Sequence, residues 1–123
     1  MFPTQLTQPQ REGTLDLLLL GIYADGAVRL AENERVYELL SPYGWDSYQD
    51  PREYSQTAIS RARGALEDAD KTGLFLADIS ARMGDDGVKK LALALLARLI
   101  EADEEATESE ADFYQQAKTA FGV

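Results

Sequence analysis

The chain has 123 residues, 45% hydrophobic and 28% charged, a composition typical of one globular domain with a single core. Its 22 acidic and 12 basic residues give a formal net charge of −10, which disfavours nucleic acids and favours cations or basic proteins as partners. The absence of Cys and His excludes disulfides, zinc–thiolate sites, thiol nucleophiles and the commonest general base.

The first ten residues contain two prolines and three glutamines without any periodic pattern. We therefore expect a loosely held arm over residues 1–10 and one folded domain over residues 11–123. The arm lacks the basic region of a signal peptide, and the apolar runs 17–24 and 91–100 are about half as long as a bilayer span. These features predict a cytoplasmic protein without membrane insertion.

The next segments have the apolar spacing of helices. Residues 11–24 are apolar almost all round, which predicts a buried helix, and Asp25-Gly26 should end it because Gly favours the left-handed turn at a helix C-terminus. A second helix is expected over residues 31–40. Residues 41–50 form an aromatic-rich connection that is too irregular for a strand.

A clear helix start follows at Asp50-Pro51-Arg52-Glu53. Asp50 should be the N-cap, and Pro51 stands at the first helical position, where no amide donor is needed. The apolar spacing continues to about Asp70, and Thr72-Gly73 should break the helix.

The C-terminal third predicts three more helices. A short one should end at Gly84, a long one should run from about Val88 to Ala102, and the last should span residues 108–121. Because apolar residues cover more than one face of the segment 88–102, we expect it to be the central and most buried helix. No segment alternates with a period of two, so the predicted fold is all-α, with about six to seven helices.

Two acidic segments each follow an apolar helix and precede another helix. The first is Ala24-Asp25-Gly26-Ala27-Val28 with Glu32, and the second is Ala102-Asp103-Glu104-Glu105-Ala106 with Glu110. In both, a Glu follows an Asp by seven residues. The first segment fits the back half of an EF-hand calcium loop, but Gly21 and Tyr23 stand where the first carboxylates should be, so a complete EF-hand is not expected.

These carboxylates also have simpler structural explanations. Thr107-Glu108-Ser109-Glu110 has the pattern of a capping box. The whole role of Glu110 could then be to accept a hydrogen bond from the backbone amide of Thr107. Asp25 can close its own turn through local hydrogen bonds. Glu32 lacks such an explanation, because Arg29, three residues earlier, cannot act as a cap.

The acidic segments resemble the TerB family of tellurite-resistance proteins. Its pattern is an apolar helix ending in Ala-Asp-Gly, a small apolar residue two positions on, and a Glu on the next helix. Residues 24–32 match the first copy, although Arg29-Leu30-Ala31 replaces the usual Ser or Pro, and residues 101–110 match the second copy except that Glu104 replaces Gly. The resemblance covers about residues 11–123 and implies a compact, non-enzymatic helical module of bacterial stress-response systems. It also implies that paired acidic residues bind a metal ion.

We therefore expect two pseudo-repeated helix–acidic turn–helix units whose carboxylates form one shared site for a divalent cation, Ca²⁺ or Mg²⁺. The residues of this site would be Asp25, Glu32, Asp103 and Glu110. The alternative is a protein–protein interaction module that docks a basic partner on its acidic face. A homodimer is compatible with either function, and no catalytic residues are expected.

Two other groups of residues have structural interpretations. Arg52, Arg61 and Arg63 are expected to form surface ion pairs with Glu67 and its neighbours. Four aromatic residues could line a ligand groove, but we favour their filling the core between two helices; these are Tyr43, Trp45, Tyr48 and Tyr54.

Overall fold

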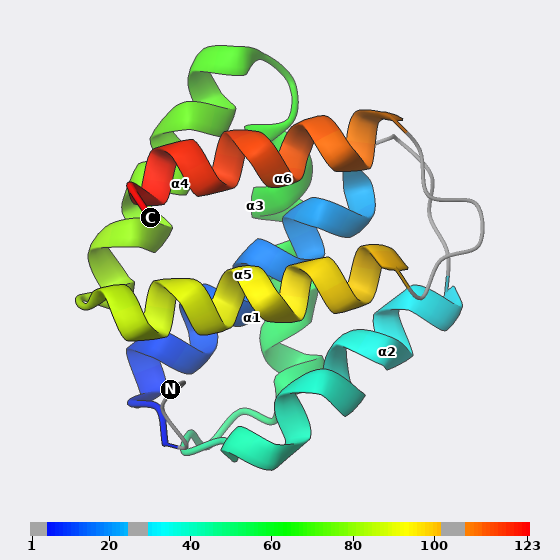
Figure 1. Ribbon diagram of the computed structural model, residues 1–123. Coiled ribbons are helices and arrows are strands. Elements are labelled where there is room, and N and C mark those ends of the chain that lie inside the picture. The colour runs from blue at the N-terminus through cyan, green and yellow to red at the C-terminus, as the bar shows by residue number, and fades with distance from the viewer. Residues whose placement is uncertain (1–4, 25–29, 102–107) are drawn as a thin grey trace.

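The computed structural model describes residues 5–24, 30–101 and 108–123, which form a single all-helical domain (Figure 1). Its elements are α1 (Gln8–Tyr23), α2 (Leu30–Leu40), the 3₁₀ turn η1 (Ser41–Tyr43), α3 (Pro51–Ala65), α4 (Ala69–Met83), α5 (Asp86–Glu101) and α6 (Glu108–Phe121). The described residues contain no strand, so the predicted all-α class is confirmed. None of these helices is long and apolar enough to cross a membrane.

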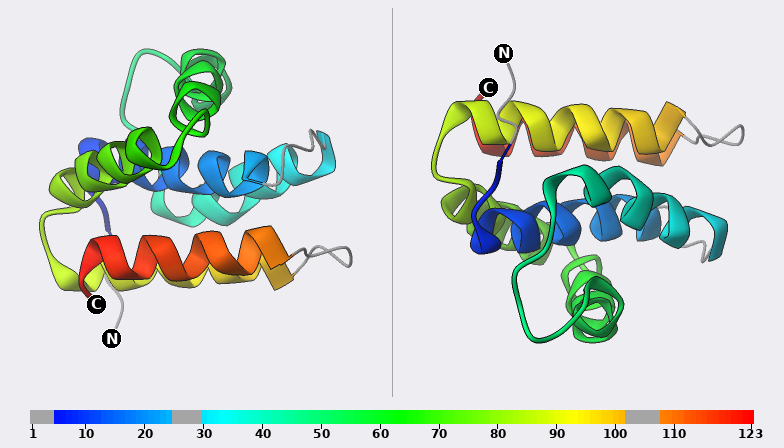
Figure 2. Two further views of the ribbon diagram at one scale, coloured as in Figure 1. Left: turned by 90° about the horizontal axis from the view of Figure 1, so that it is seen from above. Right: turned by 90° about the horizontal axis from the view of Figure 1, so that it is seen from below.

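Helix α1 is at the centre of the domain. It contacts each of the helices α2 to α6, and every residue from Gly13 to Tyr23 is buried. Figure 2 shows α1 in a middle layer, with α5 and α6 side by side on one side and α3 on the other. The prediction of a buried helix in this segment is confirmed.

The prediction that residues 88–102 form the most buried helix is wrong. Leu91, Leu95 and Leu99 of α5 are buried as expected, but Lys90 and Arg98 on the same helix are exposed. Helix α5 lies in an outer layer, so one of its faces meets solvent. Helix α1 is covered from both sides and therefore has no such face between residues 13 and 23.

The boundary between α3 and α4 also differs from the prediction. The chain turns after Ala65, and Thr72 and Gly73 lie inside α4 instead of breaking a helix. Asp68 caps α4 by accepting a hydrogen bond from the backbone N–H three residues on, at 2.7 Å. The Thr72 hydroxyl donates to the Ala65 carbonyl oxygen at 2.7 Å. These bonds stabilise the turn and outweigh the low helix propensity of a single glycine.

The predicted start of α3 is confirmed, whereas α1 begins three residues earlier than predicted. Asp50 accepts a hydrogen bond from the Glu53 N–H at 2.9 Å, as an N-cap should. Helix α1 begins at Gln8, within the segment expected to be an arm, because Thr7 and Gln10 form a capping box. Leu6 is also buried against the core, so the domain extends at least to this residue.

Candidate functional site

Of the four predicted cation-binding residues, the structure describes the backbone position of two. Asp25 and Asp103 fall outside the described residues, and Glu32 and Glu110 each occupy the third position of a helix, α2 and α6. Within the described ranges, no group of three or more carboxylates could hold a metal ion. The shared site therefore stays a prediction.

The helix ends that border the two acidic segments lie at the same end of the molecule. Figures 1 and 2 show the C-terminal ends of α1 and α5 and the N-terminal ends of α2 and α6 on one side. Gly21, in the last turn of α1, leaves no room for a side chain: a Cβ atom there would lie 2.7 Å from Leu96 Cδ1 and 3.6 Å from the Phe113 ring. The end of α1 therefore packs directly against α5 and α6.

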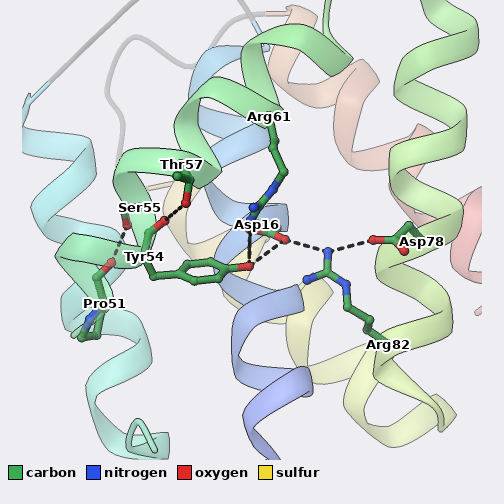
Figure 3. A network of polar contacts seen from close by, with 8 residues as sticks. All are labelled: Asp16, Pro51, Tyr54, Ser55, Thr57, Arg61, Asp78 and Arg82. Atoms are coloured by element: carbon green, nitrogen blue, oxygen red, sulfur yellow. Dashed lines mark hydrogen bonds and ion pairs between the residues drawn. The ribbon is translucent and has the colours of Figure 1, made fainter. Parts of the chain in front are cut away.

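A second candidate site is built around Asp16, a buried acidic residue of α1 (Figure 3). Only 1% of Asp16 is exposed. Both of its carboxylate oxygens accept from the Tyr54 hydroxyl at 3.1 Å, and Oδ2 accepts from Arg82 Nη2 at 2.6 Å. Arg61 Nη2 lies 3.5 Å from Oδ1 and donates to the Tyr54 oxygen at 3.0 Å. This network, Asp16, Tyr54, Arg61 and Arg82, is called the Asp16 network below.

Burial and charge shift the pKa values of the Asp16 network. Burial raises the pKa of the Asp16 carboxyl above its ordinary value, and the positive charges of Arg82 and Arg61 oppose this shift. Burial and the nearby Asp16 raise the pKa of Tyr54 to about 12. The Tyr54 hydroxyl therefore keeps its proton at neutral pH and remains a donor to the carboxylate.

A groove of about 710 Å³ opens beside the Asp16 network and is lined by α1, α3 and α4. We call it the α3–α4 groove. Its polar end contains the Asp16 network, and much of the remaining lining is apolar, including Ala65, Leu74 and Phe75. Leu74 is 73% exposed, one of two strongly exposed large hydrophobic residues in the described part of the chain. An apolar groove with a few convergent polar groups is the usual form of a small-molecule site.

The sequence contained a signal for the Asp16 network that our prediction did not use. Asp16 is the single charged residue in the apolar segment 13–23, and a charge in such a helix requires a partner. Arg61 was expected to pair on the surface near Glu67, and this is wrong: it faces Asp16 because it lies two helical turns after Tyr54, on the same side of α3. Glu67 instead pairs with Lys71 at 2.7 Å.

The aromatic residues follow the prediction only in part. Tyr54 is buried and packs edge-on against Trp45, with ring centroids 5.5 Å apart. Tyr48 is 97% exposed and does not fill the core. The connection between η1 and α3 therefore places its aromatic side chains in different environments.

Comparisons with known proteins assign no family to the chain. No protein-family model, curated protein or solved structure matches it. The resemblance to the TerB family therefore rests on the residues of the acidic segments and stays a prediction.

Proposed function

We propose that this is a non-enzymatic helical protein that binds one divalent cation, Ca²⁺ or Mg²⁺, through its two acidic segments. The ligands would be Asp25, Glu32, Asp103 and Glu110. The observation that carries the proposal is the common position of the bordering helix ends at one end of the molecule. Segments anchored at the same end can contribute to one coordination sphere, whereas segments at opposite ends could not.

The contacts between helices support a paired arrangement. The pair α1–α2 packs against the pair α5–α6 through contacts of α1 with α5 and α6 and of α2 with α5. This packing is compatible with two pseudo-repeated helix–acidic turn–helix units. Each unit would contribute one Asp and one Glu to the site.

The chemistry of helix ends also favours a hard cation at this position. The C-terminal ends of α1 and α5 expose carbonyl oxygens, which are hard ligands like carboxylates. Four converging carboxylates repel one another, and this repulsion is relieved by a cation or by protonation. The empty protein should therefore gain stability when a divalent ion is added.

Calorimetric titration and thermal melting of metal-stripped protein with Ca²⁺, Mg²⁺ and Mn²⁺ test the proposal. We expect at least one ion to bind with one-to-one stoichiometry and raise the melting temperature. The double variant Asp25→Asn, Asp103→Asn should lose this response and should be more stable than the wild type without ions, because repulsion is reduced. The charge-matched control Asp46→Asn, Asp70→Asn, at exposed positions elsewhere, should respond like the wild type. A response that survives in the first double variant, or no response in the wild type, would refute the shared site.

The second candidate function is a protein–protein interaction module that docks a basic partner. It is favoured by the exposed carboxylates of Glu101 and Asp112, which border the second acidic segment. In that case a lysine-rich peptide should bind in a salt-sensitive manner, and divalent ions should leave the melting temperature unchanged. The bacterial stress-response role, the cytoplasmic location and a homodimer stay predictions from the sequence.

A further inference from the structure

The α3–α4 groove has the dimensions of a small-molecule site. Its volume of about 710 Å³ lies within the range of roughly 300–1,000 Å³ that is typical of ligand pockets. Leu74 and Phe75 provide apolar surface on its α4 side, and a Cβ atom built on Gly64, which lines the α3 side, would meet nothing within 4 Å. The groove therefore offers open space above an apolar surface.

The arginines of the groove retain unused hydrogen-bond donors. Among the described residues, the hydrogen bonds of Arg61 both come from Nη2, and its side chain is 47% exposed. Arg82 Nε is buried and has no partner in the described part of the chain. A guanidinium carries five N–H donors, so donors of Arg61 are free to meet an acceptor that enters the groove.

The charged residues of the groove disfavour a dianion more than a monoanion. Three cations, Arg61, Lys71 and Arg82, line the groove and are balanced by three carboxylates, one of which is Asp16. Glu12 and Asp78 also line the groove, and Asp78 lies 3.2 Å from Arg82 Nη2. These two carboxylates would repel a dianion such as a phosphate monoester more strongly than a monoanion.

We infer that the α3–α4 groove binds a small organic monocarboxylate. The planar carboxylate of the ligand would accept hydrogen bonds from Arg61, whose fork of donors matches this geometry. Its apolar body would cover Leu74 and Phe75 and remove this surface from water. This inference is independent of the proposed cation site, because it uses none of the four acidic residues of that site.

Octanoate is a suitable probe, with octylammonium as its charge-reversed counterpart of similar length. Binding can be followed by two-dimensional NMR of the backbone amides and by calorimetric titration. We expect octanoate to cause saturable shifts at amides of α3 and α4 around the groove. Because the chain carries a net charge of −10, nonspecific attraction would favour octylammonium. Stronger binding of octanoate would therefore reflect the groove itself.

Three variants test the assignment of the contacts. Arg61→Gln should weaken octanoate binding by about ten- to hundredfold, because a charge-assisted hydrogen bond is lost. Arg63→Gln removes the same charge from α3, but Arg63 stacks on the Tyr23 ring at 5.4 Å and does not line the groove, so binding should be unchanged. Leu74→Asp, at an exposed position that should tolerate the change, should also weaken binding.

Three results would overturn the inference. The first is the absence of saturable octanoate binding to the wild-type protein. The second is equal affinity for octanoate in the wild type and in Arg61→Gln. The third is octylammonium binding in the same groove as tightly as octanoate.

Discussion

Asp16 links three helices through one buried carboxylate. It belongs to α1 and accepts hydrogen bonds from Tyr54 of α3 and Arg82 of α4. A buried ion pair adds little net stability compared with apolar residues, because both charges lose their hydration. Removing Asp16 is costly, however, because Arg82 then keeps, among the described residues, only the exposed Asp78 as a counter-charge.

Substitution of Asp16 by Asn should therefore destabilise the protein. We expect the free energy of unfolding to fall by about 3 kcal/mol, because Arg82 loses its principal counter-charge. Urea denaturation followed by circular dichroism measures this change. The control is Glu34→Gln, which disrupts a solvent-exposed ion pair with Arg52 and should leave the free energy of unfolding almost unchanged. Equal losses in the two variants would contradict a structural role for the buried pair.

Tyr54 should make stability depend on alkaline pH. Its folded-state pKa of about 12 lies above its ordinary value of 10.0, so between these values the folded protein holds a proton that the unfolded chain releases. The free energy of unfolding should therefore decrease as pH rises from 10 to 12. This decrease should be smaller in Tyr54→Phe, whereas Tyr48→Phe, at a fully exposed position, should behave like the wild type. Urea denaturation at several alkaline pH values tests this, and identical profiles for both variants would contradict it.

At the scale of the elements, the cap of α3 was predictable from the sequence, whereas the caps of α1 and α4 were missed. Asp50-Pro51 carries its start signal in adjacent residues, so the sequence alone predicted the beginning of α3 correctly. The end of α3 could not be predicted in the same way. It depends on competition between the Asp68 cap and an apolar pattern that runs through the turn, and the Thr72–Ala65 hydrogen bond decides this competition only in the folded chain.

Removal of the Asp50 cap should have a moderate effect. Asp50→Ala should lower the free energy of unfolding by about 1 kcal/mol, because the Glu53 N–H loses its acceptor. Thermal melting at neutral pH measures the difference. Asp46→Ala, at an exposed position in the connection before α3, is the matched control and should melt like the wild type. A wild-type melting curve for Asp50→Ala would show that this cap contributes nothing.

At the scale of the whole molecule, burial depends on which helix the others surround. Both α1 and α5 have apolar sequences, and apolar content alone does not predict which of the two helices lies in the middle layer. The same limit applies to the α3–α4 groove. Arg61 and Arg82 belong to different helices, and their convergence on Asp16 is a property of the packing. The acidic segments, in contrast, were visible as local motifs, and their convergence on one site stays a proposal.

The central position of α1 predicts a gradient of hydrogen exchange. Backbone amides of residues 13–23 should exchange only through global unfolding, because every neighbouring helix must separate before they meet water. Amides of α6, which lies in an outer layer, should exchange through smaller openings. Native-state exchange followed by NMR compares the two helices. Slower exchange in α6 than in α1 would contradict this order.

The place of α1 in the chain has a consequence for synthesis. Its neighbours Leu96 and Phe113 are translated long after Gly21, which they cover in the finished fold. The leucine-rich segment 15–20 therefore emerges from the ribosome well before α5 and α6 have been synthesised. Its side chains cannot be fully buried until both helices have emerged. Apolar side chains that stay exposed during translation are prone to aggregation. The nascent chain should consequently depend on chaperones during most of its translation, even though the completed domain is small.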